Sequence, residues 1–102
     1  MNAALQQHKD EIEALCRQYG VLRLDLFGSA TGPTFDPATS DYDFLVEFDA
    51  CNVPGYADRY LGLLEELTSL LGRPVDLVVE RAIRNPYFKE GVNRSRQLFY
   101  AA

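Results

Sequence analysis

Residues 40–48, SDYDFLVEF, decide the fold, because they combine a strand pattern with two closely spaced aspartates. Residues 44–46 form an uninterrupted apolar run, which is typical of a strand covered on both faces. Side chains alternate along a strand with a period of two, so Asp41 and Asp43 project from one face and Tyr42 from the other. The sequence therefore predicts a strand over residues 41–48 that presents two carboxylates on one face.

Further segments on either side show helix or strand periodicity. Apolar residues between 56 and 71 keep helical spacing over three turns, and Gly72 and Pro74 end this helix. The expected elements are, in chain order, a helix at 2–19, a strand at 21–27, a loop at 30–40, the strand at 41–48, a helix at 56–71, a strand at 75–79 and a closing helix that starts at Asn85-Pro86 and carries Phe88, Val92 and Phe99 on one face. Such an order predicts an α/β (α+β) fold, with helices packed on a small mixed sheet of about three or four strands.

The bulk composition indicates one soluble globular domain over residues 1–102. Hydrophobic residues make up 47% of the chain and charged residues 25%. The net charge of −5 argues against sequence-independent binding of nucleic acid, which needs an excess of Lys and Arg. Charges interrupt the apolar stretches, and the start lacks a basic region leading into an apolar segment. We therefore expect a cytoplasmic protein with neither nucleic acid nor a membrane as its partner.

Cysteine and histidine offer little chemistry in this chain. Cys16 and Cys51 are 35 positions apart, without CxxC spacing or a neighbouring histidine, so a zinc site is not expected. Cys16 falls on an apolar helical face and is interpreted as a buried thiol. His8, the one histidine, has polar surroundings that favour a solvated side chain.

A third aspartate, Asp76, interrupts the apolar strand expected at 75–79. Two carboxylates on one strand face, about 6.5 to 7 Å apart, repel one another unless a cation lies between them. Mg²⁺ meets this need, because it binds one or two carboxylates together with phosphates and waters. We therefore expect Asp41, Asp43 and Asp76 to form a metal site. The structural alternative is that Asp41 ends a loop, Asp43 lies on a solvated face and Asp76 accepts a hydrogen bond.

The pair Gly28 and Ser29 directly follows the strand expected at 21–27. Glycine lacks a Cβ and lets backbone approach a ligand closely. Ser29 is placed to open a short helix whose free N–H groups face a phosphate, or to donate through its hydroxyl. The plainer interpretation is a strand-to-turn glycine followed by a serine N-cap.

Four motifs together resemble the minimal nucleotidyltransferases of the DNA polymerase β-like superfamily. They are LFGS at 26–29, SDYDFLVEF at 40–48, VDLV at 75–78 and RNPYF at 84–88. The resemblance covers nearly the whole chain and implies a sheet like the palm of nucleotidyltransferases. It also implies that Gly28 and Ser29 contact a triphosphate, and that the catalytic Asp41, Asp43 and Asp76 ligate two Mg²⁺ ions.

The same resemblance implies an enzyme that transfers AMP from ATP to a hydroxyl of a partner protein by two-metal displacement. Such family members are commonly the antitoxin of a toxin–antitoxin pair, so the implied partner is a cognate HEPN-type toxin. One departure concerns positive charge: family members often carry an arginine soon after the Gly-Ser pair, whereas residues 30–33 are ATGP. Basic side chains of the last third could compensate, although a solvated helix face is the simpler role for most of Arg81, Arg84, Lys89, Arg94 and Arg96.

Two other hypotheses stay open. The chain could be a catalytically weak or inactive binding module that neutralises the partner toxin by forming a stoichiometric complex. The missing arginines favour this module, and the three intact aspartates oppose it. Transfer to RNA or to a small molecule fits the superfamily but not a chain of 102 residues, because recognition of those acceptors usually takes an additional domain.

Overall fold

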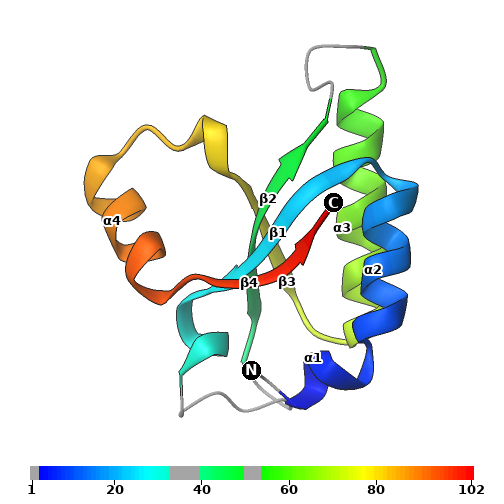
Figure 1. Ribbon diagram of the computed structural model, residues 1–102, viewed down its shortest axis with the longest axis horizontal. Helices are drawn as coiled ribbons and strands as arrows, with labels where there is room; N and C mark the ends of the chain where they lie inside the picture. The colour runs from blue at the N-terminus through cyan, green and yellow to red at the C-terminus, as the bar shows by residue number, and fades with distance from the viewer. Residues whose placement is uncertain (1–2, 33–39, 50–53) are drawn as a thin grey trace.

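The computed structural model describes residues 3–32, 40–49 and 54–102, and it shows one sheet with helices on both faces (Figure 1). The α/β class expected from the sequence, with a mixed sheet of three or four strands, is confirmed. The elements are, in chain order, α1 (Ala3–Gln7), α2 (Lys9–Gln18), β1 (Val21–Phe27), the 3-10 turn η1 (Gly28–Thr31), β2 (Tyr42–Phe48), α3 (Tyr56–Leu71), β3 (Val75–Val79), the 3-10 turn η2 (Glu80–Ala82), α4 (Pro86–Ser95) and β4 (Gln97–Ala101). Within these described ranges, every helix is too short or too polar to cross a membrane.

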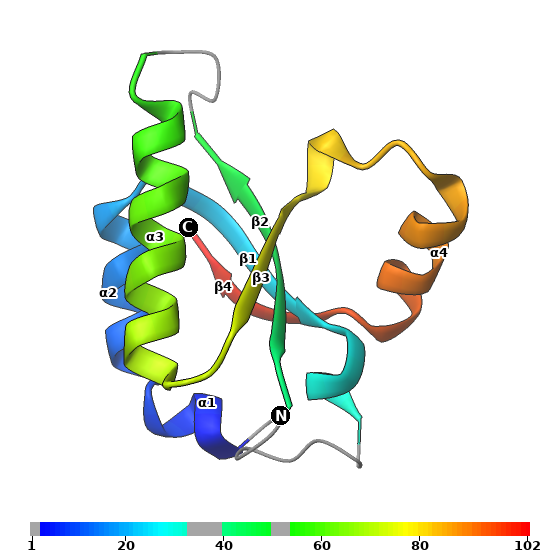
Figure 2. The same cartoon turned by 180° about the vertical axis from the view of Figure 1, so that it is seen from behind.

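The strands lie in the order β3-β2-β1-β4. Strand β1 runs antiparallel to both β2 and β4, whereas β2 and β3 are parallel. Parallel neighbours need a crossover connection, and α3 provides it across one face of the sheet (Figure 2). The three strands that carry the expected site residues are therefore adjacent. In the resulting register, Asp43 of β2 lies opposite Phe27 of β1 and Asp76 of β3.

The main core lies between α2, α3 and one face of the sheet (Figure 2). Its fully buried side chains include Ile12, Leu24, Phe44, Val46, Leu63 and Leu67. Burying one such side chain contributes about 1.5 to 3 kcal/mol, so this layer is a main source of stability. Cys16 belongs to the same core, as the sequence predicts, and burial raises the pKa of its thiol to about 12. Cys51 lies outside the described residues.

A smaller apolar cluster holds α4 on the opposite face of the sheet. Its buried members are Phe27, Leu45 and Val92, against which Val78 and Ile83 pack. The start of α4 agrees with the sequence: the Asn85 side chain accepts hydrogen bonds from two backbone amides of the first turn, and Pro86 follows it. The face that carries Asp43 is therefore partly covered, by one short helix.

Two helices differ from the expected ranges. The N-terminal helix is interrupted at His8, which separates α1 from α2. The prediction that Phe99 continues the face of α4 is wrong, because α4 ends at Ser95 and Phe99 is buried on β4. Arg96 is extended, with φ −62° and ψ 137°, and the chain then pairs with the free edge of β1. This tertiary pairing overrides the helical spacing of the apolar residues.

Strand β1 keeps the expected alternation only in part. Its register with β2 shifts between Val21 and Arg23, and Leu22 is 45% exposed while the two following leucines are buried. Asp25 is fully buried, although Arg23, two positions earlier on the strand, is exposed. A buried carboxylate needs charged or hydrogen-bonding partners, and here they are Arg23 of β1 and Arg96 at the end of α4.

Candidate active site

Asp43 and Asp76 lie side by side on neighbouring strands. They are register partners in the parallel β2–β3 pair, and strands of a sheet lie about 4.8 Å apart. Register partners project from the same face of a sheet. The neighbouring side chain of Tyr42 is 2% exposed and packs in the main core, so the two carboxylates lie on the other face, the one that α4 partly covers. Strand pairing alone thus brings together two of the three expected aspartates.

Among the described residues, no basic side chain pairs with the carboxylates of Asp43 and Asp76. Burial raises the pKa of the Asp43 carboxyl, and the nearby carboxylates of Asp76 and Asp41 raise it further. Neither Asp43 nor Asp76 forms a hydrogen bond or an ion pair with another side chain in the described part of the chain. A cation placed between them would offset both the burial and the repulsion.

Asp41 directly precedes β2 and is exposed. Its Oδ1 lies 3.6 Å from Nη2 of Arg73, and Nε of Arg73 donates to the Ser40 carbonyl oxygen at 3.2 Å. The structure therefore brings Asp43 and Asp76 together and holds Asp41 beside an arginine, near enough to act on Asp43 electrostatically. Sequence reasoning missed Arg73, because the turn after α3 meets the start of β2 only in the folded chain.

Gly28 provides the space that the Asp43 carboxylate occupies. Its φ is +73°, a conformation that favours glycine, and a Cβ built there would lie 2.6 Å from Oδ2 of Asp43. The Gly28 N–H donates to Oγ of Ser95, at 3.0 Å, so the end of α4 fixes this turn. Ser29 follows in the short turn η1, where its side chain is exposed. The loop that continues at 33–39 lies outside the described residues.

We expect Gly28→Ala to lower the free energy of unfolding by about 1 to 3 kcal/mol, because the added Cβ meets Asp43 and the positive φ strains alanine. Gly72→Ala is the matched control. Gly72 has a similar φ of +67° but open space around its Cβ position, so it reports backbone strain alone. Urea denaturation of both variants measures the difference. If both variants lose the same free energy of unfolding, the close approach of Asp43 to Gly28 does not contribute to the cost.

Asp43→Asn is expected to stabilise the protein at neutral pH in the presence of a chelator. The pKa of Asp43 is raised in the folded state, so its ionised form is less favourable there than in the unfolded chain. The stability that this carboxyl contributes is present below its unfolded pKa and is lost as pH rises through its folded pKa. Asparagine does not titrate, so the advantage of the variant should grow between about pH 3 and pH 7.

Thermal melts across this pH range test the sign. Asp41→Asn serves as the control: it removes the smallest of the effects that raise the pKa of Asp43 and also loses an ion pair with Arg73, so its gain should be smaller. A stability difference between wild type and Asp43→Asn that shrinks as pH rises contradicts the assignment.

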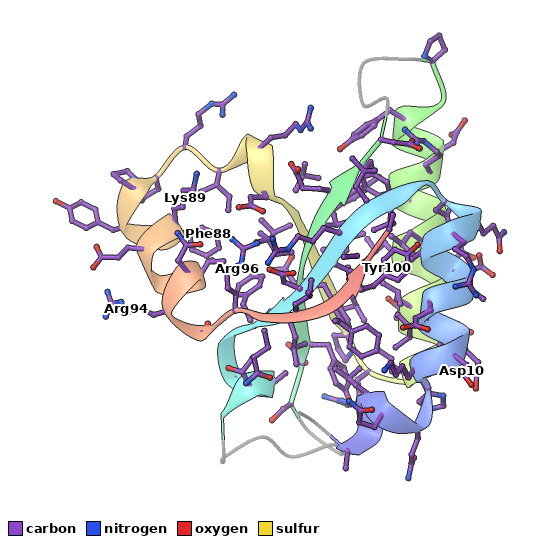
Figure 3. All side chains as sticks on the ribbon, in the orientation of Figure 1. Asp10, Phe88, Lys89, Arg94, Arg96 and Tyr100 are labelled. Atoms are coloured by element: carbon purple, nitrogen blue, oxygen red, sulfur yellow. The ribbon has the colours of Figure 1, made fainter. Side chains whose placement is uncertain are left out.

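We call Asp41, Asp43 and Asp76 the aspartate row. A partly buried ionic network around Asp25 lies on the face of the sheet that α4 partly covers. Arg96 donates to Oδ2 of Asp25 at 2.5 Å and to both carboxylate oxygens of Glu80 at 2.9 and 3.0 Å. Arg23 donates to the other oxygen of Asp25 at 2.9 Å. Figure 3 shows Arg96 pointing into the space between α4 and the sheet. Arg96 is therefore not among the basic residues that lie on a solvated helix face, and its guanidinium holds the pKa of Glu80 below its usual value.

The remaining basic residues of the last third have local partners or face solvent. Arg94 pairs with Glu90 along α4, and Arg81 pairs with Glu47. Arg84 donates to the carbonyl oxygen of Arg81. Lys89 makes no ion pair or hydrogen bond within the described ranges. None of these contacts involves the aspartate row.

The carboxylates of Asp43 and Asp76 could hold Mg²⁺ together with oxygens of a substrate. Mg²⁺ is commonly held by one or two carboxylates, with substrate phosphates and waters completing its octahedron. Asp43 and Asp76 supply two unpartnered carboxylates on one face, and Asp41 stands at the adjacent strand end. Within residues 3–32, 40–49 and 54–102, no three His, Cys, Asp or Glu side chains are close enough to enclose an ion. A metal at this row would thus depend on substrate oxygens as well as on the protein.

The chain is similar to several known proteins in sequence and in fold. Residues 9–99 match the model of the nucleotidyltransferase domain. A protein of Methanocaldococcus jannaschii with the provisional name protein adenylyltransferase is 40% identical over 89 residues, which are 86% of this chain and 83% of that relative. The solved structure of a provisional minimal nucleotidyltransferase is 30% identical, with a TM-score of 0.75 and 95% of both chains covered. A complex of the tri-AMPylated Shewanella oneidensis HEPN toxin with an MNT antitoxin matches with a TM-score of 0.66. The match covers 95% of this chain and 72% of that chain, and at 21% identity it shows a similar fold alone.

Proposed function

Because the chain belongs to the nucleotidyltransferase domain family, we propose that it transfers AMP from ATP to a hydroxyl of a partner protein, and that this partner is a HEPN-type toxin. The observation that carries the proposal is the pairing of Asp43 with Asp76 beside the space left by Gly28. Within the described residues these two carboxylates have no side-chain partner, and together they would form a site for a polyphosphate held through divalent cations. The curated relative, provisionally a protein adenylyltransferase, supports a protein as the acceptor.

Each residue of the row has a distinct part in the proposed reaction. Gly28 leaves room for the Asp43 carboxylate and for an approaching phosphate, and the exposed Ser29 hydroxyl can donate to a phosphate oxygen. Asp41, Asp43 and Asp76 would hold Mg²⁺, with two ions expected. The bound ions would supply charge neutralisation on the triphosphate and would lower the pKa of the acceptor hydroxyl.

The transfer itself is a displacement at the α-phosphorus of ATP. The acceptor oxygen forms a new bond to this phosphorus while the bond to the bridging oxygen of pyrophosphate breaks, and the hydroxyl proton leaves to solvent. The chain aligns the reactants and offers carboxylate charge at one place, and it needs no histidine base. His8, the one histidine, lies between α1 and α2 and has no part in the row.

Two arguments support a protein partner: the exposure of the site and the content of one structural neighbour. The acceptor hydroxyl must be brought to an open row of carboxylates, and a folded partner that docks can present it. The structural neighbour that contains an AMPylated HEPN toxin supplies the class of partner. The rival proposal, a module that neutralises its toxin by occupying it, uses the same docking without transfer.

The test is incubation with ATP, Mg²⁺ and a HEPN-type protein encoded beside this chain's gene. Mass spectrometry should find AMP on a hydroxyl of the partner, and a chelator should prevent its addition. If wild type leaves the partner unmodified yet suppresses its activity at equimolar amounts, the transfer proposal fails and the binding module replaces it. Addition of AMP that continues in a chelator would refute the metal assignment alone.

A further inference from the structure

Strand β3 is the last strand at one edge of the sheet (Figure 2). A groove of about 590 Å³ is lined in part by its residues. We call it the β3 groove. It lies between α3 and the segment that joins β3 to α4, and its lining includes Tyr60, Leu77, Val79, Ile83, Arg84 and Phe88. Most of these side chains are apolar, and Phe88 is 45% exposed. Exposed apolar surface beside a free strand edge is typical of a binding surface for another polypeptide.

The backbone of β3 offers hydrogen-bonding groups to this groove. The Tyr42 N–H donates to the Pro74 carbonyl oxygen, so Pro74 faces β2. The N–H and C=O groups of successive residues point to opposite sides of a strand. Those of Leu77 and Val79, at odd spacing from Pro74, therefore point away from β2 and toward the groove. The Tyr60 hydroxyl donates to the Leu77 carbonyl oxygen and occupies it, and an extended segment could pair with the other outward-facing backbone groups of β3.

The groove is lined by residues of β3, the strand that also carries Asp76. Gly28 and Ser29 stand at the β1 end of the row, next to Asp43, and this end is assigned to the triphosphate. Asp76 stands at the other end, on the edge strand itself. A polypeptide along β3 would therefore pass directly beside Asp76. Its hydroxyl could reach the row from the side opposite the triphosphate, as an in-line displacement requires.

Two basic side chains, Arg84 and Lys89, stand near the end of the groove that is farthest along the chain from Asp76. Arg84 lines the groove, and Lys89 follows Phe88 on α4 (Figure 3). Neighbouring carboxylates are already engaged: Glu80 by Arg96, Glu47 by Arg81 and Glu90 by Arg94. The local excess of Arg84 and Lys89 contrasts with the net charge of −5 of the whole chain. An acidic partner segment would complement these two side chains.

We propose that the β3 groove binds an extended acidic segment of the acceptor protein, which adds to the sheet as a strand beside β3 and presents its hydroxyl to Asp76. Main-chain pairing would give affinity, and the apolar lining would take alternate side chains of the segment. Arg84 and Lys89 would select acidic residues. The part played by the hydroxyl rests on the proposed transfer of AMP, whereas binding of the segment does not.

Peptide binding without ATP tests the groove separately from the reaction. The probe is a fluorescein-labelled peptide in which valine and glutamate alternate around one tyrosine, and lysine replaces glutamate in its control. Fluorescence anisotropy should show binding of the glutamate peptide at low salt and about tenfold weaker binding to Arg84→Glu with Lys89→Glu. Hydrogen exchange should slow at the amides of Val75–Val79. Arg17→Glu, an exposed reversal on α2, should leave the binding unchanged.

A backbone variant tests the strand pairing itself. The φ of Val79 is −82°, which proline can adopt, and Val79→Pro removes an N–H that faces the groove and not β2. It should weaken peptide binding while circular dichroism stays unchanged. If this variant does not fold, the charge reversal decides the question.

Several outcomes would overturn the proposal. They are absence of binding to wild type, equal binding of the lysine peptide, and an unaffected charge-reversed variant. If the charge-reversed variant or Val79→Pro raises the KM for ATP but not the KM for the acceptor, the groove binds the base of the nucleotide instead. If groove variants still modify the HEPN-type partner at the wild-type KM and kcat while Asp76→Asn does not, the groove proposal fails and the proposed function stands.

Discussion

Asp76→Asn is expected to lower the rate of AMP transfer to the partner by about three orders of magnitude. Loss of one group that stabilises transition-state charge typically costs a factor of 10² to 10³, and Asp76 would in addition hold Mg²⁺ at the acceptor end of the row. Asparagine keeps the size of the side chain but not its charge. The Asp76 side chain is exposed and makes no hydrogen bond within the described residues, so the fold should not change.

The control for this variant is Asp10→Asn, an exposed aspartate of α2 on the far side of the sheet (Figure 3). Its transfer rate should match that of wild type in the same mass-spectrometric assay. Thermal melts with Mg²⁺ and ATP add a second measurement, since a ligand that binds only the folded state raises its stability. A transfer rate for Asp76→Asn within a factor of three of wild type would remove Asp76 from the catalytic row.

The aspartate row shows what a sequence can predict of a site. The period of two predicts that Asp41 and Asp43 share a face, and the buried Tyr42 agrees with this alternation. The family, too, was predicted from the motifs and is confirmed. The pairing of Asp43 with Asp76 was expected but not derivable, because it depends on strand order and register. The roles of the aspartates as metal ligands stay a prediction.

The features that the sequence did not reveal all depend on contacts between distant segments. Residues 97–101 continue a helical pattern, yet the free edge of β1 offers a row of hydrogen bonds that a helix end lacks. Arg73 and Arg96 look like ordinary surface charges in the sequence. Only the fold places Arg73 beside Asp41 and Arg96 beside the buried Asp25.

Two consecutive residues at the end of α4 contact β1 and the turn that follows it. Ser95 accepts the Gly28 N–H, and the next residue, Arg96, reaches Asp25 on β1. The turn that contains Gly28 directly follows β1, so both contacts fix the same part of the chain. The position of the expected phosphate-binding turn therefore depends on a helix that is distant in sequence and held by few apolar contacts.

Arg96→Met should accordingly cost about 3 kcal/mol of folding stability, since it leaves Asp25, which is fully buried, without its main partner. Total stabilities are about 5 to 15 kcal/mol, so the melting temperature should fall by roughly 10 to 20 °C. Adding Asp25→Asn should recover much of the loss, because the buried charge is then absent. Arg94→Met is the matched control: its pair with Glu90 is exposed and should contribute less than about 0.5 kcal/mol. If Arg96→Met melts within a few degrees of wild type, Arg23 alone satisfies Asp25, and the anchoring of α4 must rest on the apolar cluster around Val92.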